Sequence, residues 1–188
     1  MRFHHCLRKS GQTDDGFSDG NSAVRRFFGV ILLLAASLAA LPSISAVAPK
    51  ADRILVLKEK RTLMLLRGRT VLHSYPISLG EHPRGTKRSE GDGRTPEGLY
   101  TIDTRVAASH YHLALHISYP NEADRSEAIA AHRSPGGAIM IHGMPNWFGR
   151  DDLQFAEDWT NGCIAVSNHA IEEIWQSVDD GTIIEIRP

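Results

Sequence analysis

The sequence predicts a mostly β (α+β) domain with two helices, preceded by a leader that is not part of the domain. Short apolar and β-branched runs alternate with Gly- and Pro-rich turns, which is typical of strands. Two other segments place apolar residues at helical spacing, and the composition changes near residue 48. With 188 residues, 41% of them hydrophobic and 23% charged, the chain suits one globular domain and a short extension.

The leader has the pattern of an export signal. Arg25 and Arg26 precede an apolar run over residues 27–41, which is followed by Pro42 and small residues. The run is shorter than the ~20 residues that usually span a bilayer, which favours a cleaved signal.

A retained anchor is the alternative, because small and apolar residues extend the run over 27–48. We therefore expect residues 1–48 to be a leader with an export signal or an inner-membrane anchor. Residues 49–188 are expected to form the exported domain on the periplasmic or cell-wall side, in contact with the membrane only through the N-terminal segment.

The first half of the domain is predicted to be strands and loops. Gly68 and Arg69 form a turn, and a stretch dense in Gly, Pro and charge forms a long loop over 81–98. Strands are predicted over 53–57, 62–66, 70–80, 99–104 and 111–118.

The second half combines two helices with two strands. Asn121 is expected to cap a short helix over 121–133, and Asn168 a second one. The second helix has one apolar face, formed by Ile171, Ile174, Trp175 and Val178. A buried strand over 138–143 leads to His142, and a last strand covers 182–186.

Charge argues against nucleic acid as a partner. From residue 49 onward the chain has 16 Lys and Arg against 19 Asp and Glu, so no broad basic surface is expected. The sequence also predicts no cofactor.

The two cysteines cannot pair within an exported domain, because Cys6 precedes the apolar run and Cys163 follows it. A leftover cysteine in an exported protein is a candidate reactive thiol. The alternative is a buried, inert cysteine that packs as a small hydrophobic side chain.

His142 is the nearest candidate partner for that thiol. It ends an apolar strand before Gly143, and Cys163 follows Gly162 at the start of another apolar stretch. A neighbouring imidazolium would lower the thiol pKa and favour thiolate, and the imidazole could pass a proton to a leaving amine. A buried histidine beside a buried cysteine would produce the same pattern, so these residues alone leave both interpretations open.

The motifs around these residues resemble a known family. "IMIHG", a loop, "TNGCIAVSN", a helix and "DDGTIIEI" resemble the L,D-transpeptidase catalytic domain (YkuD-like), as does "GDGRTPEGLYTI". The resemblance covers about residues 53 to 187. "GCIA" most resembles the YafK-type murein L,D-transpeptidase branch. The family implies a β-sandwich with one helix after the catalytic cysteine and a second short helix.

The resemblance also implies a chemistry and the residues for it. Cys163 would be the nucleophile and His142 the general acid and base, oriented by the Gly143 backbone carbonyl. The N–H groups of Gly162 and Cys163 would bind the oxyanion, with no metal. The thiolate would attack diaminopimelate in a peptidoglycan stem peptide, D-alanine would leave, and an amine of another stem or of a wall-attached protein would resolve the thioester.

Two departures from the family pattern leave the acceptor open. Ala165 replaces an arginine and Asn161 a histidine that many relatives have. Water as acceptor would make the protein an amidase that releases a protein from diaminopimelate, or an L,D-carboxypeptidase. A non-catalytic wall-binding module is a third alternative.

Further residues are candidates with competing interpretations. Arg94, Thr160, Asn161 and Trp147 are expected to contact substrate, whereas Phe148 and Trp159 would either wall the groove or anchor the loop. His110, His112 and His116 have spacing that fits a metal site or a polar cleft wall, and the second is favoured. An acid that orients His142 is a minor alternative; the candidates are Asp151, Asp152, Glu157 and Asp158.

Overall fold

The computed structural model describes residues 49–147 and 157–188. The predicted leader, with its export signal or anchor, lies outside this range, as do Phe148, Asp151 and Asp152. Within the described ranges, no helix is long and apolar enough to cross a membrane.

The domain is a mixed eight-stranded sheet with two helices, which confirms the predicted mostly β fold class. The strand order is β3-β2-β1-β8-β4-β5-β6-β7. The strands are β1 Arg53–Leu57, β2 Thr62–Arg67, β3 Thr70–Pro76, β4 Gly98–Ser109, β5 His112–Ile117, β6 Met140–His142, β7 Ile164–Ala165 and β8 Ile183–Arg187; the helices are α1 Glu122–Ala130 and α2 Asn168–Ser177.

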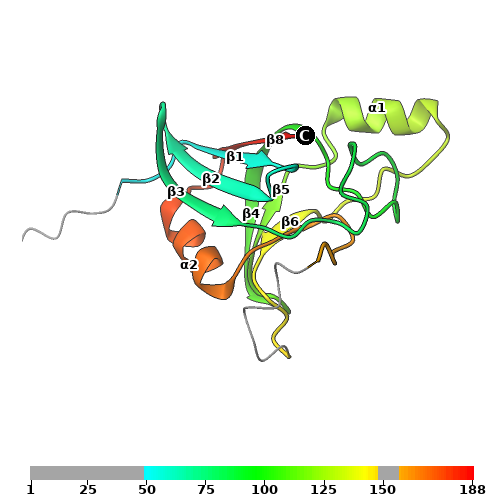
Figure 1. The fold of residues 1–188 in the computed structure, drawn as a ribbon. Helices are drawn as coiled ribbons and strands as arrows, with labels where there is room; N and C mark the ends of the chain where they lie inside the picture. The colour runs from blue at the N-terminus through cyan, green and yellow to red at the C-terminus, as the bar shows by residue number, and fades with distance from the viewer. Residues whose placement is uncertain (1–48, 148–156) are drawn as a thin grey trace, which may run out of the picture. The chain divides into compact units, whose positions relative to one another are not determined.

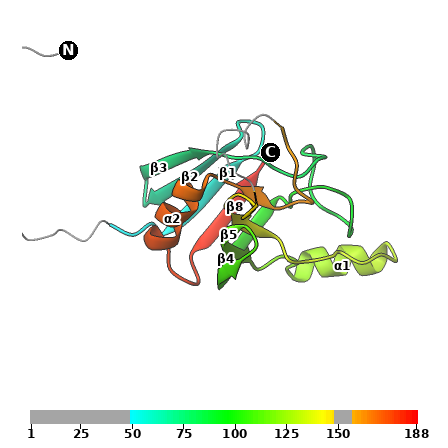
Figure 2. The same cartoon turned by 90° about the horizontal axis from the view of Figure 1, so that it is seen from below.

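Strand β4 joins the two halves of the sheet. Its first residues, 98–101, pair with β8, and from Ile102 onward it pairs with β5. One hydrophobic core contains side chains from both halves and from α2. Figures 1 and 2 show α2 against the sheet and α1 apart from it, at the far end of the domain.

The core follows from the alternation of residues along the strands. In β1, Ile54 and Val56 are fully buried, and Ile184 and Ile186 of the parallel neighbour β8 face the same core. Ile171 and Ile174 place the apolar face of α2 against this surface. Burying each such side chain contributes about 1.5–3 kcal/mol, so these positions hold α2 against the sheet.

The helix boundaries differ from the predicted ones. Asn121 caps α1 as expected, with a complete capping box through Asp124. The helix ends at Ala130 because His132 turns the chain with a φ of 52°, so the predicted end at residue 133 is wrong. The predicted cap of α2 is also wrong: Ser167 accepts a hydrogen bond from the Ala170 N–H, and Asn168 is already helical.

Three strands differ most from the prediction, and four others differ by one or two residues at an end. β3 ends at Pro76, and Ser78 and Gly80 continue only as isolated bridges to Ala165 and Thr160. β4 extends to Ser109, because register shifts in its pairing with β5 let the hairpin run on. The short strand β7 was not predicted; two residues carry too little alternation to reveal a strand.

We expect Ser167→Ala to lower the free energy of unfolding by about 1 kcal/mol, because the α2 N-terminus loses its cap. Gln176→Ala, at an exposed position of the same helix, should change it by less than about 0.5 kcal/mol. Urea titrations of the two variants measure the difference. Equal stabilities would show that the Ser167 hydroxyl does not cap the helix.

Candidate active site

The parallel pairing of β6 and β7 brings His142 and Cys163 to one face of the sheet. His142 is in register with Ala165, and Ile141 with Ile164. Side chains alternate along a strand, so Cys163, two residues before Ala165, points to the same side as His142. Both side chains line one cleft of about 310 Å³.

The rest of the cleft wall is apolar or uncharged. It comes from the β4–β5 hairpin, the strand β6 with its approach, and the segment before the cysteine. The lining residues besides the pair are Ser109, Tyr111, Ala114, Ala138, Met140, Trp159, Thr160 and Asn161.

The Gly143 carbonyl defines the tautomer of His142, and burial favours its neutral form. It is only 4% exposed, and Nδ1 lies 2.7 Å from the Gly143 carbonyl oxygen. A carbonyl can only accept, so Nδ1 carries the hydrogen and the neutral ring keeps its lone pair on Nε2. Burial lowers the pKa of His142, and the bond to Gly143 opposes this only in part.

The Cys163 thiol is shifted in the opposite direction. Burial raises its pKa above the ordinary value; the backbone of Met140 and the charge of Lys87 lower it, but less. The sulfur lies 3.6 Å from the Ala138 carbonyl oxygen, a partner for a protonated thiol. Desolvation penalises both charges, so these pKa directions favour a neutral thiol and a neutral imidazole over the expected thiolate–imidazolium pair in the free site.

Aromatic rings cover the histidine. The Tyr111 ring centroid lies 4.5 Å from that of His142, and the Trp159 centroid 5.8 Å. Tyr111 is at the tip of the β4–β5 hairpin, which Asn146 braces: its Nδ2 donates to Ser109 O, and its Oδ1 accepts from the His112 N–H. Tyr111 is not among the site residues expected from the sequence; its position between His110 and His112 was the available signal.

The loop before Cys163 is shaped by the Thr160 hydroxyl. This hydroxyl donates to Cys163 O at 2.8 Å and accepts from the Gly162 N–H at 3.1 Å. The family resemblance assigns the Gly162 N–H to an oxyanion hole. In the structure this N–H donates within the loop, to Thr160 Oγ1. Thr160 is likewise buried and bonded within the loop, although it borders the cleft.

Two glycines let another loop approach the catalytic segment. A Cβ on Gly162, which has a φ of 118°, would lie 2.4 Å from Arg94 O. A Cβ on Gly80 would lie 2.1 Å from Gly93 O. Only residues without side chains fit these positions.

An ion pair fixes the residue next to Trp159. Arg61, in the β1–β2 turn, donates from Nε and Nη2 to the Asp158 carboxylate, at 2.6 Å in the shortest contact. Asp158 also accepts from the Leu79 N–H. Its partners are thus Arg61 and Leu79 rather than His142, and Glu157 is exposed.

The other residues expected to contact substrate differ in whether they line the cleft. Asn161 is exposed and lines it. Trp147 is 70% exposed and packs near Tyr111, with centroids 5.9 Å apart. Arg94 does not line the cleft: its Nη1 is the nearest atom, at 3.9 Å, to a Cβ built on Gly85.

The histidines of β5 are paired with separate acids. His112 Nε2 lies 2.6 Å from Glu172 Oε1, and His116 Nδ1 lies 2.6 Å from Asp103 Oδ1. In the described part of the chain, no group of three or more His, Cys, Asp or Glu side chains is placed to hold a metal ion.

We expect Gly162→Ala to lower the free energy of unfolding by at least about 2 kcal/mol, because its φ is strained for alanine and its Cβ meets a backbone oxygen. Gly137→Ala is the matched control: its Cβ would have open space, so stability should be almost unchanged. Denaturant titrations of both variants test this. A Gly162→Ala protein as stable as the control would contradict the close approach.

The pKa directions predict how thiol alkylation depends on pH. The rate of iodoacetamide reaction at Cys163 should still be rising at pH 8.5, the ordinary thiol midpoint, because burial raises the thiol pKa. His142→Gln should leave the profile nearly unchanged, since a neutral ring provides no charge to lose. A plateau below pH 7 that disappears in His142→Gln would reveal an ion pair and contradict this account.

The fold and the motifs agree with known proteins. Residues 51–186 match the profile of the YkuD, L,D-transpeptidase catalytic domain, family. The chain is 34% identical over 131 residues to YafK of Escherichia coli (strain K12), a proposed L,D-transpeptidase. That match covers 66% of this chain and 46% of the relative.

Two solved structures are similar over most of the domain. Pgp2, a helical cell shape determining protein of Campylobacter jejuni, has a TM-score of 0.57 at 25% identity over 72% of this chain and 46% of that one. Bd1075 of Bdellovibrio bacteriovorus has a TM-score of 0.50 at 27% identity over 71% and 46%. The chain spans about half the length of these relatives. Because the family profile covers most of the chain and the fold agrees with it, this protein belongs to the L,D-transpeptidase catalytic domain family.

Proposed function

We propose that this protein is an exported cysteine L,D-transpeptidase that acts on peptidoglycan stem peptides. The observation that supports this is the placement of Cys163 and His142 on one face of the β6–β7 pair, in one cleft. A thiol beside a neutral imidazole whose orientation is fixed by a backbone carbonyl is the arrangement that nucleophilic acyl transfer requires.

The first half-reaction starts from the neutral pair. As the sulfur attacks the carbonyl carbon of diaminopimelate, the lone pair on His142 Nε2 takes the thiol proton. The imidazolium then gives this proton to the departing D-alanine nitrogen, and a thioester remains on Cys163. Charge arises only as the carbonyl is attacked, which avoids a buried ion pair in the free protein.

The oxyanion is assigned to the Cys163 N–H. Gly162 is the weaker of the two expected donors, because its N–H already donates to Thr160 Oγ1. The same bond, with that of Thr160 to Cys163 O, holds the loop in one conformation before substrate arrives, as a preorganised donor requires.

In the second half-reaction an amine attacks the thioester. His142, neutral again, removes its proton, and the thiol is regenerated as the new amide forms. The amine would come from another stem peptide, which gives a crosslink, or from a protein that becomes attached to the wall.

Hydrolysis is the second candidate outcome. Ala165 is fully buried and bonded to Ser78 through its backbone, so it offers no group to guide an acceptor. Among the described residues that line the cleft, none is a lysine or an arginine. With water as acceptor the same site would trim stems or release an attached protein.

Intact-mass measurement tests the shared chemistry. After incubation with a stem tetrapeptide, the full chain should gain the mass of the donor minus D-alanine, and Cys163→Ala should gain nothing. His142→Gln should acylate at least about 100-fold more slowly, because proton transfer is lost. His116→Gln, outside the cleft and paired with Asp103, should acylate like the wild type.

Product analysis separates the two outcomes. Incubation with muropeptides should yield crosslinked dimers if an amine is the acceptor, and only shortened or released stems if water is. An unmodified wild-type mass with an intact donor would contradict both. An adduct of equal size on Cys163→Ala would show that the nucleophile is another residue.

A further inference from the structure

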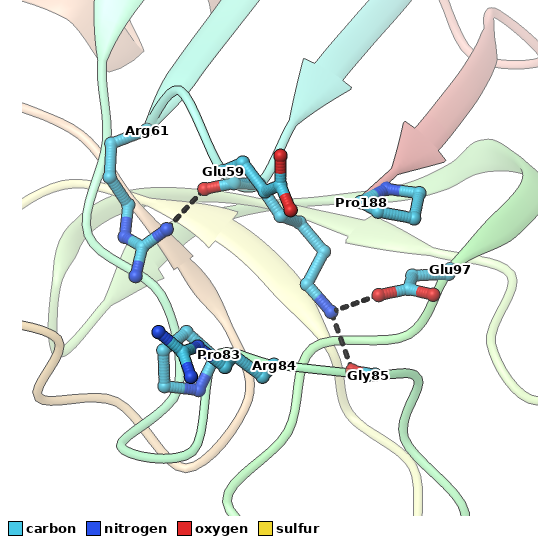
Figure 3. A pocket seen from close by; sticks show the side chains of 8 residues that line it. Glu59, Arg61, Pro83, Arg84, Gly85, Glu97 and Pro188 are labelled. Atoms are coloured by element: carbon cyan, nitrogen blue, oxygen red, sulfur yellow. Dashed lines mark hydrogen bonds and ion pairs between the residues drawn. The ribbon is translucent and has the colours of Figure 1, made fainter.

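A second cavity, of about 450 Å³, lies between the β1–β2 turn and the loop that precedes β4 (Figure 3). It shares no lining residue with the catalytic cleft. Its volume is within the usual range for small-molecule sites. The lining residues are Lys58, Glu59, Arg61, Pro83, Arg84, Gly85, Glu97 and Pro188.

Lys58 builds one wall of this cavity and is not available to a ligand. Its side chain is 2% exposed, and Nζ donates to Gly85 O at 2.7 Å, Thr95 O at 2.9 Å and Glu97 Oε1 at 2.8 Å. An ammonium has three N–H donors, so all of them are used. The Lys58–Glu97 pair is therefore a fixed, neutral part of the wall.

Arg61 and Arg84 have donors left over. Arg61 binds Asp158 through Nε and Nη2 and Lys58 O through Nη1, so each Nη keeps one further N–H. Arg84 is exposed and makes no hydrogen bond or ion pair within the described ranges. In Figure 3 both guanidinium groups lie on the side of the pocket opposite Glu97.

The charges around the cavity select the kind of ligand. Lys58 is paired with Glu97 and Arg61 with Asp158, so the lining is left with the cation of Arg84 and the carboxylate of Glu59. A ligand with one carboxylate and one ammonium balances these charges better than a phosphate dianion does. Guanidinium N–H pairs also match carboxylate geometry.

Glu59 offers a carboxylate to an ammonium group of the ligand. Its carboxylate forms no hydrogen bond or ion pair within the described ranges, although it lines the same cavity. A free carboxylate beside two donor-rich guanidinium groups suits a ligand that has both an ammonium and a carboxylate.

We propose that this cavity binds a short peptide or amino acid, with its carboxylate on Arg61 and Arg84 and its ammonium on Glu59. The site is separate from the cleft of Cys163, and the proposal does not depend on the chemistry there. One link to that cleft is Arg61, whose partner Asp158 precedes the cleft residue Trp159.

Equilibrium dialysis of the full chain with L-alanyl-D-alanine and with its C-terminal amide tests the proposal. The Cys163→Ala background prevents turnover. The free carboxylate peptide should bind, and the amide at least about tenfold more weakly, since a charge-assisted pair is lost. Arg84→Gln should weaken binding about fivefold, whereas Arg69→Gln, at the exposed β2–β3 turn, should not.

A second variant probes the ammonium. Glu59→Gln should weaken binding of L-alanyl-D-alanine but not of N-acetyl-D-alanine, which has no ammonium. Equal binding of the peptide and its amide, no binding of either, or wild-type affinity in Arg84→Gln would overturn the proposal. Stronger competition by inorganic phosphate than by the peptide would overturn the assignment of a carboxylate. All of these outcomes are independent of acylation at Cys163, because the binding measurements use the Cys163→Ala background.

Discussion

The register between β6 and β7 is the constraint on which the candidate site depends. β7 has two residues, yet bonds hold it on both sides: Val166 N–H donates to His142 O, and Ala165 exchanges two backbone hydrogen bonds with Ser78. A slip of one residue would turn the sulfur to the opposite face of the sheet. The position of Cys163 is thus set by backbone bonds that do not depend on its own side chain.

Long-range polar contacts hold the loops against this short strand. Lys58 Nζ donates to backbone carbonyls of the loop before β4, and Arg61 binds Asp158 in the segment that leads to Cys163. Burying an ammonium costs desolvation energy, so these contacts add less to stability than to the choice of one loop conformation. These contacts join the β1–β2 turn to segments up to 97 residues away. At Gly80 and Gly162, the lack of a side chain lets the backbones of neighbouring segments approach each other closely.

Much of the fold could be predicted because it rests on local patterns. Alternation along β1, β2 and β8 and the apolar face of α2 are visible in the sequence, and Cys163 and His142 were identified from residue type and context. The Lys58 contacts, the Arg61–Asp158 pair and the side on which Arg94 lies arise from tertiary packing, which no local window contains. The pKa directions of this pair could not be predicted from the sequence for the same reason: burial depends on what surrounds the pair, and it raises the pKa of Cys163 and lowers that of His142.

The burial that raises the pKa of Cys163 also bears on chemical survival. Peroxides and disulfides react with thiolate far more readily than with thiol, so a half-buried neutral sulfur is slow to become sulfenic acid. The protein is proposed to work outside the reducing cytoplasm, and Cys163 is the only cysteine in residues 49–147 and 157–188. Slow oxidation of this thiol therefore matters between turnovers. The same desolvation that delays ionisation until a carbonyl is in place would spare the enzyme from inactivation while it is empty.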